Sequence, residues 1–281
     1  MRKGCCIRNE ICPNCYNNLN SWGIDFSIPL LIGNIMRKFL VEIQYNGKNY
    51  SGFQNVSNGT SIESKLCYAI EKVFEQKTKI NGCSRTDAGV SAESYFFDFA
   101  VDTKLPTERV PFKLNRYLPK DIQAISAKEV GLDFNARHDA LSKTYEYGFY
   151  ISDHTLPLLN PKNYKLPTNI NVEDMRVACK MIEGKHDFIA FKTVDKNDIS
   201  TVRTIYSAEL LQDGKRLVFK ICGEGFLYNM VRILAGTLVK VGEGKLSQNE
   251  LTQLLSGKKQ RQDNPALTLP PNALLLKAVK Y

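Results

Sequence analysis

Gly82-Cys83-Ser84-Arg85-Thr86-Asp87-Ala88-Gly89-Val90-Ser91-Ala92 places a cation, a carboxylate and a flexible glycine within one short link. The link joins two apolar segments that have the pattern of strands, one at Ile80 and the other from Tyr95 to Phe99. A loop fixed by strands at both ends holds its side chains in place. We therefore expect Asp87 on a rigid platform, where Gly89 leaves the backbone open to close approach. The alternative interpretation is a plain Asx turn ended by a glycine.

Composition limits the kind of protein in which this loop can lie. The chain has 281 residues, 43% of them hydrophobic, which suffices for the core of one large domain or two ordinary ones. Its formal net charge is +9, with lysine and arginine spread along the chain, and this favours a polyanionic partner such as nucleic acid. The sequence has no apolar run of about 18 residues for a membrane span and no apolar core of a secretion signal. We expect a cytoplasmic protein.

The eight cysteines form two groups. Cys67, Cys83, Cys179 and Cys222 are scattered, which is typical of small buried hydrophobes in a reducing compartment. The others are Cys5, Cys6, Cys12 and Cys15, and the last two have the spacing of a zinc knuckle, so a four-cysteine zinc site is one interpretation. Residues 1–35 are rich in asparagine and lack sustained periodicity. We predict instead that they are a disordered extension, or follow a wrongly chosen start codon, and bind no metal.

From Met36 onward, apolar residues recur with the periods of strands and helices, which predicts an α+β fold. Two helix starts carry a capping box, Thr60 with Glu63 and Ser247 with Glu250. The predicted strands are 39–45, about 80, 95–99, 122–126, 142–150, 201–211, 216–222 and 273–279. The predicted helices are 62–74, 110–117, 175–182, 226–239 and one beginning at 247.

The strand at 142–150 carries three aromatic side chains on one face, Tyr145, Tyr147 and Phe149. Flanked by Lys143 and Arg137, such a face suits base stacking and phosphate contact. The alternative is that the aromatic stripe belongs to the core.

The helix at 226–239 is apolar on nearly all sides, which predicts that it is buried. A buried Arg232 would then need a carboxylate partner. The alternatives are that Arg232 reaches the surface or pairs with Glu224 or another acid. His186 has Asp187 beside it, but adjacent side chains often point apart, so we predict a structural hydrogen bond rather than a catalytic base.

Three of these stretches resemble, in order, the motifs of the TruA family of tRNA pseudouridine synthases. Residues 85–90 are similar to the family's Arg-Thr-Asp-(Ala or Lys)-Gly-Val pattern around its catalytic aspartate. Residues 143–147 resemble its (Arg or Lys)-x-Tyr-x-Tyr strand, and residues 226–232 its Phe-x-x-x-Met-Val-Arg helix. The resemblance covers about residues 36–281. Ser84 and Ser91 stand where many members have glycine and histidine, so the exact loop contacts stay open.

The resemblance implies isomerisation of uridine to pseudouridine at positions 38, 39 and 40 of the tRNA anticodon stem-loop, without metal or organic cofactor. It implies Asp87 as the catalytic carboxylate and Arg232 as the partner that keeps it ionised and oriented. Tyr145 would stack on the uracil and assist proton loss at C5, and Arg85 would enter the space that the flipped nucleotide leaves. With these residues, Thr86 is expected to bind substrate. Whether Asp87 attacks C1′, adds to the ring or removes a sugar proton stays open.

The implied architecture is a pseudouridine synthase fold with two similar halves, 36–145 with the catalytic loop and 146–281. Their antiparallel sheets would form one continuous sheet, flanked by helices, around a central basic cleft. A homodimer that binds tRNA is also expected from the family. Two alternatives remain: a related synthase that modifies another RNA site, and a non-catalytic tRNA-binding protein on the same fold. The intact Asp87, Tyr145 and Arg232 argue against the second.

Overall fold

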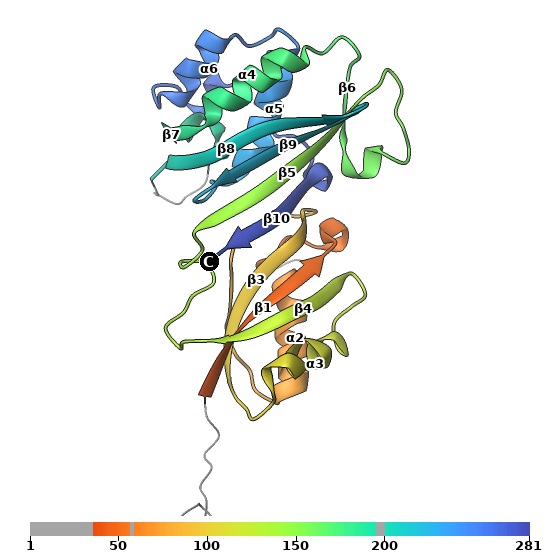
Figure 1. The fold of residues 1–281 in the computed structure, drawn as a ribbon, viewed down its shortest axis with the longest axis vertical. Coiled ribbons are helices and arrows are strands. Elements are labelled where there is room, and N and C mark those ends of the chain that lie inside the picture. Colours follow the sequence, from red (N-terminus) through yellow and green to blue (C-terminus); the bar gives the residue numbers. More distant parts are fainter. Residues whose placement is uncertain (1–35, 57–58, 195–199) are drawn as a thin grey trace, which may run out of the picture. The chain divides into compact units, whose positions relative to one another are not determined.

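A computed structural model describes residues 36–56, 59–194 and 200–281 (Figure 1). The extension and the zinc alternative considered for residues 1–35 lie outside these described residues. From Met36 to Tyr281 the chain forms one compact unit that combines strands with helices, so the predicted α+β class is confirmed. Among the described residues, no helix has the length and apolar content needed to cross a bilayer.

A mostly antiparallel sheet runs through this unit in the order β4-β1-β3-β10-β5-β9-β8-β7. On one side of β10, β1 (Met36–Tyr45) pairs with both β3 (Ser91–Asp102) and β4 (Ile122–Val130). The other side consists of β5 (Ser142–Ile151), β9 (Arg216–Gly223), β8 (Val202–Asp213) and β7 (Gly184–Asp187). Two short strands, β2 (Ile80–Gly82) and β6 (Tyr164–Leu166), pair with β3 and β5. The predicted division into halves at residues 145 and 146 would fall inside β5 and stays a prediction.

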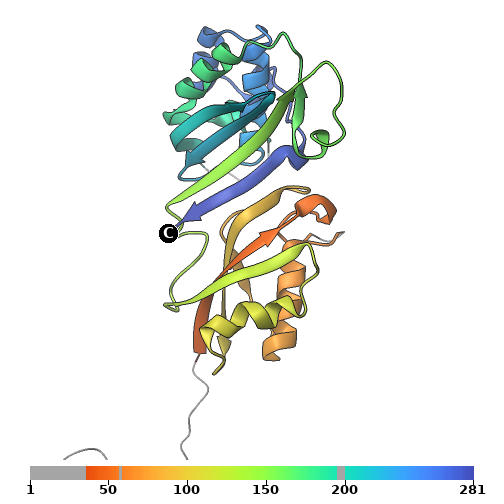
Figure 2. The same cartoon turned by 45° about the vertical axis from the view of Figure 1, so that its right-hand side comes forward.

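The last strand, β10 (Leu274–Lys280), joins the two groups of strands (Figure 2). It pairs parallel with β3 and antiparallel with β5, so the end of the chain lies in the middle of the sheet. In this register Leu276 is opposite Ala92 on one side and Tyr145 on the other. Because β3 begins directly after the Asp87 loop, β10 holds that loop close to the strand of Tyr145.

The described residues form five α-helices: α2 (Ile62–Phe74), α3 (Val110–Asn115), α4 (Val172–Ile182), α5 (Met230–Gly242) and α6 (Gln248–Leu255). The first four pack against strands of the sheet, and α6 packs on α4. Figure 1 shows α2 and α3 next to each other, with α3 below β4, and α5 behind β9. The capping box of Ser247 and Glu250 is confirmed at the start of α6. The one predicted for α2 is wrong: Ser61 Oγ caps this helix by accepting from Ser64 N, and Glu63 accepts from Asn55 N instead.

The helix predicted at 226–239 begins four residues later, at Met230. The physical reason is Asn229, whose φ of 59° and ψ of 6° are left-handed and cannot continue a right-handed helix. The prediction that this helix is buried is confirmed, since every residue of α5 except Arg232 and Lys240 is buried.

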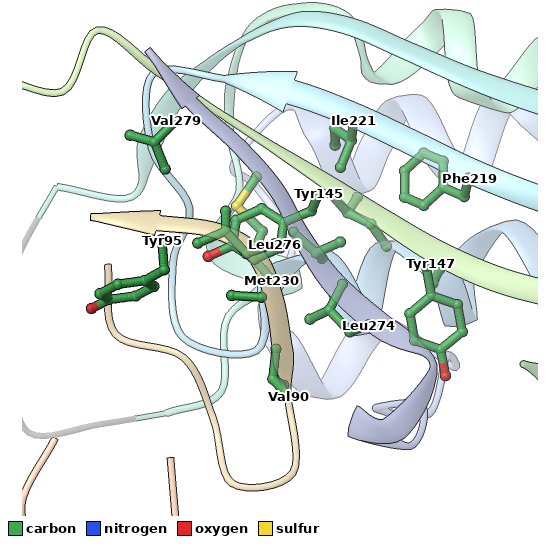
Figure 3. Packing of buried hydrophobic residues seen from close by; sticks show 14 of the residues in the cluster. Val90, Tyr95, Tyr145, Tyr147, Phe219, Ile221, Met230, Leu274, Leu276 and Val279 are labelled. Carbon is green, nitrogen blue, oxygen red and sulfur yellow. The ribbon is translucent and has the colours of Figure 1, made fainter. Parts of the chain in front are cut away.

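The aromatic stripe on β5 belongs largely to the core. Tyr147 and Phe149 have no exposed surface and Tyr145 is 5% exposed, so the core interpretation is right for this face. Figure 3 shows Tyr145 together with Leu276 and Met230 where β10 pairs with β5. Of the scattered cysteines, Cys83 and Cys179 are buried as predicted, whereas Cys67 and Cys222 are half-buried.

Candidate active site

The loop between β2 and β3 is held on a neighbouring segment of backbone, residues 47–53. Phe53 N donates to Thr86 O and Gly89 N donates to Tyr50 O, both at 3.2 Å. The contact is close enough that a Cβ on Gly52 would lie 2.6 Å from Thr86 O. The loop that carries Asp87 is therefore braced along its length, as its position between strands predicts.

Thr86 anchors this loop to the core. Its side chain is 7% exposed, and its hydroxyl lies 2.8 Å from the Tyr45 hydroxyl, within hydrogen-bonding distance. The neighbouring Asp87 side chain instead contacts Arg232 of α5, and it is 20% exposed. The substrate-binding role expected of Thr86 stays a prediction, and its observed contact is with Tyr45.

Asp87 and Arg232 form an ion pair across 145 residues of sequence, with Nη1 donating to Oδ2 at 3.1 Å. The guanidinium is held at two further points: Nε donates to Leu269 O and Nη1 to Asn229 Oδ1, both at 2.7 Å. Glu224, the alternative partner, accepts from Thr204 N instead. Burial raises the pKa of the Asp87 carboxyl above its ordinary value, although the hydrogen bond and charge of Arg232 act in the opposite direction.

Tyr145 reaches the same loop from β5. Its hydroxyl lies 3.0 Å from Ser84 Oγ, and its ring meets Phe226 edge-on with centroids 5.2 Å apart. Burial raises the pKa of the Tyr145 hydroxyl; the hydrogen bond with Ser84 opposes this, and the nearby charge of Asp87 adds to it. The three residues predicted to be catalytic, Asp87, Tyr145 and Arg232, thus meet from a loop, a strand and a helix.

A turn before β10 completes the site, and its part in the site was not predicted from the sequence. Leu269 supplies the carbonyl to Arg232, and the next residue, Pro270, accepts from the Tyr147 hydroxyl at 2.9 Å. The following Pro271 lies so close to Gly89 that a Cβ there would be 3.1 Å from its ring. Pro270-Pro271 was the available signal, because paired prolines fix a turn. The turn therefore contacts both Arg232 and the loop that carries Asp87.

Three cations lie next to the site. Arg85 and Arg137 are exposed and near enough to interact, since the charge of Arg85 helps burial to lower the pKa of Arg137. Lys143 is half-buried, and burial lowers its pKa. Within the described residues, no ion pair joins any of the three to an acid. Such a cluster suits an anionic ligand.

His186 and metal ligation can be assessed from the described part of the chain. The His186 Nε2 atom lies 2.8 Å from the Glu183 carbonyl oxygen, and the ring meets Phe188 edge-on, which is the structural role predicted for it.

In residues 36–56, 59–194 and 200–281, no group of three or more histidine, cysteine, aspartate or glutamate side chains could hold a metal ion.

The model of a protein family described as tRNA pseudouridine synthase matches residues 42–139 and 178–281 of this sequence. The chain belongs to the tRNA pseudouridine synthase family. As a member of this family it is an isomerase, and the resemblance to TruA is confirmed. The matched residues of the tRNA pseudouridine synthase model include Asp87 and Arg232, whereas Tyr145 lies between the two matched segments.

Relatives that carry the family name match nearly the whole described chain. One, named tRNA pseudouridine synthase A, from Geobacter sp. (strain M21), is 40% identical over 246 residues, which are 88% of this chain and 99% of the relative. Another of that name, from Thermoanaerobacter sp. (strain X514), is 35% identical over 88% of this chain and 100% of its own length. A solved archaeal box H/ACA sRNP Nop10-Cbf5 complex aligns with 72% of this chain and 43% of that chain at 14% identity and a TM-score of 0.32, too distant a likeness to bear on the fold.

Proposed function

We propose that this chain converts uridine to pseudouridine in tRNA, at positions 38, 39 and 40 of the anticodon stem-loop, with Asp87 as the catalytic carboxylate. The observation that carries the proposal is the ion pair of Asp87 with Arg232, which brings two distant motifs together at 3.1 Å. Membership of the tRNA pseudouridine synthase family supports the type of reaction and the class of substrate.

The reaction balances without an oxidant or a reductant. The bond between N1 of uracil and C1′ of ribose breaks, and a bond between C5 and C1′ forms. The proton on C5 leaves, and N1 gains one, so product and substrate have the same atoms. The chemistry needs a carboxylate at the sugar or base in a site from which water is excluded.

Asp87 acts in its ionised form in this proposal, whether it attacks C1′, adds to the ring or takes a proton from the sugar. Its burial works against ionisation, and Arg232 offsets part of that cost. The positive charge of Arg232 also orients the carboxylate oxygen Oδ2, which leaves Oδ1 for the substrate. This arrangement supports a carboxylate held ready to react rather than one neutralised by many partners.

Tyr145 stacks on the flipped uracil and assists proton loss at C5. Because burial raises the pKa of Tyr145, its hydroxyl is protonated at neutral pH. A neutral phenol can accept a proton only as it gives up its own. Ser84 Oγ, at 3.0 Å, can take that proton as it releases its own proton to solvent. Arg85 fills the space left by the flipped nucleotide, while Arg137 and Lys143 contact phosphates of the RNA backbone.

The proposal also includes a homodimer and a cytoplasmic location, in keeping with a tRNA substrate. The mass in solution tests the first point. Light scattering after size exclusion would give twice the chain mass of 31.8 kDa for a dimer. A mass of one chain at micromolar concentration would contradict the dimer and leave the chemistry at Asp87 untouched.

The experiment that tests the function measures tritium release from tRNA labelled with [5-³H]uridine, followed by mapping of the product positions. We expect release by the wild-type protein, none by Asp87→Ala, and pseudouridine at positions 38 to 40. Pseudouridine at other positions would favour the related synthase with another target. Binding of tRNA without release would overturn the synthase function in favour of a non-catalytic tRNA-binding protein.

A further inference from the structure

Asn229 occupies the N-cap position of α5, yet it does not cap the helix. Its φ of 59° makes it one of only two non-glycine residues with positive φ in the described chain, the other being Glu75. Asparagine at an N-cap normally accepts from a backbone N–H in the first turn, but no such bond is present here. The side-chain amide of Asn229 is therefore free for other contacts.

Both ends of that amide are used, and one of them binds Arg232. Asn229 Oδ1 accepts from Arg232 Nη1 at 2.7 Å, and Nδ2 donates to Thr193 Oγ1 at 2.9 Å. Thr193 is itself docked on the same segment, because its backbone N–H donates to Tyr228 O at 3.1 Å. The amide thus links the guanidinium to a part of the chain that is distant in sequence and is also hydrogen-bonded to Tyr228.

The guanidinium is consequently fixed by neutral groups at both ends. Leu269 O holds Nε and Asn229 Oδ1 holds Nη1, and the second hydrogen on Nη1 faces Asp87 Oδ2. Neither neutral acceptor changes its charge during a reaction. If the carboxylate of Asp87 becomes neutral or covalently engaged, the two acceptors still keep Arg232 in place, so that it can stabilise the carboxylate again when it re-forms.

We infer that Asn229 is a positioning residue that holds the Arg232 guanidinium against Asp87 through the reaction cycle. The inference rests on the proposed role of Asp87 and adds a residue to it. Asn229 forms no described contact with Asp87 or Tyr145, so it acts through Arg232. Its left-handed backbone, which disfavours most side chains, is retained where it aims the amide at the guanidinium.

The test compares Asn229→Gly and Asn229→Asp with wild type and Asp87→Asn in the tritium-release assay. Glycine adopts positive φ freely, so Asn229→Gly removes the amide and leaves the backbone conformation. We expect its kcat to fall about 10- to 100-fold, with KM for tRNA changed less than about threefold. Asn229→Asp keeps the acceptor oxygen, and we expect it to recover part of the lost kcat.

The pH profile separates positioning from a merely structural role. The groups that interact with Asp87 are Arg232 from α5 and Tyr145 from β5, and Tyr147 faces Arg232. A looser Arg232 lowers the pKa of Asp87 less, so the acid limb of kcat in Asn229→Gly should move to higher pH. Glu75→Gly, at the other left-handed residue, at the end of α2, is the matched control and should leave kcat and the limb unchanged.

Thr193→Val gives a second variant if the first folds poorly. It removes only the hydroxyl that accepts from Asn229 Nδ2. We expect a two- to fivefold loss in kcat, and we expect the acid limb of kcat to move to higher pH, as in Asn229→Gly. Wild-type kcat and an unmoved acid limb in Asn229→Gly or Thr193→Val would overturn the inference, as would Asn229→Asp being no better than Asn229→Gly. Full release by Asp87→Asn would instead overturn the proposed function.

Discussion

Two carboxylates of the same strand and loop unit, the buried Asp98 and the half-buried Asp87, differ in how fully they are paired. Asp98, on β3, has no exposed surface, and both its oxygens are occupied. Asn81 Nδ2 donates to Oδ1 at 2.9 Å, Lys38 Nζ lies 3.1 Å from the same oxygen, and Ala136 N donates to Oδ2 at 2.7 Å. The Asp87 carboxylate has a single hydrogen bond within the described residues, from Arg232, and the side chain is 20% exposed.

The difference separates a structural carboxylate from a reactive one. A buried carboxylate with partners on both oxygens is fixed in place and is not available to a substrate. Asp98 braces the loop after β4, since its bond to Ala136 and the Lys38 bonds to the Leu132 and Phe134 carbonyls hold residues 132–137. Asp87 is braced only through its backbone and one cation, which leaves an oxygen free.

The largest effect is expected from Asp87→Asn, which removes the charge and keeps the shape. We expect the rate of tritium release to fall on the order of 10³-fold or more, because an amide cannot serve as nucleophile or base. Circular dichroism should show an unchanged fold. A variant that is folded and loses less than about tenfold would show that the unpaired carboxylate is not the reactive group.

Asp98→Asn should lower the stability of the fold rather than the rate of the reaction. Leaving Lys38 without its carboxylate in a buried site is expected to cost about 3 kcal/mol of unfolding free energy, measured by urea denaturation. Glu93→Gln is the matched control, because it breaks an exposed pair with Lys277 and should cost less than about 1 kcal/mol. Equal losses in the two variants would mean that saturation of Asp98 contributes little.

Arg232→Lys tests whether a positive charge alone is enough to keep the Asp87 carboxylate ionised and oriented. A lysine keeps the charge but cannot reach Leu269 O, Asn229 Oδ1 and Asp87 Oδ2 from a planar fork. We expect kcat to fall about 10- to 100-fold, with tRNA affinity nearly unchanged in a filter-binding assay. A wild-type kcat would show that a point charge suffices and that the shape of the guanidinium is irrelevant.

The sequence pattern alone predicts that a buried Arg232 needs a carboxylate partner, and it leaves Glu224 open as that partner. The resemblance to the family names Asp87, and the structure shows that pair. The place of β10 in the middle of the sheet could not be worked out from periodicity alone, which gives a strand but not its neighbours. The structural role of Asp98 could not be predicted for a related reason. It sits in an aromatic run that predicts a strand, and nothing local shows that its side chain would meet Lys38.

The contacts that hold Arg232 were also beyond prediction. Leu269 contributes a backbone carbonyl, and any residue type supplies one, so no side-chain pattern marks it. Asn229 was assigned to the interior of a helix because its neighbours are apolar at helical spacing. Its left-handed conformation, which moves the start of α5 to Met230, depends on the tertiary contacts of its amide with Thr193 and Arg232.

The smallest expected effect is that of Asp87→Asn on the stability of the fold. This substitution should stabilise the protein at neutral pH, whereas Asp98→Asn should destabilise it. Burial raises the pKa of the folded-state carboxyl above its unfolded value, so between the two values the folded protein binds more protons than the unfolded chain. The unfolding free energy of the wild type therefore falls as pH rises through that window and stays lower above it. Asp87→Asn carries no such cost, since its amide does not ionise.

We therefore expect Asp87→Asn to melt higher than wild type at pH 7, by on the order of 1–2 °C, and to match it at pH values below the ordinary range of carboxyl groups. Asp98→Asn should melt lower than wild type at pH 7, because its partners are left unsatisfied. Calorimetry of both variants across pH measures the two signs together. A lower melting temperature for Asp87→Asn at pH 7 would mean that Arg232 outweighs burial, and that Asp87, like Asp98, stabilises the fold it belongs to.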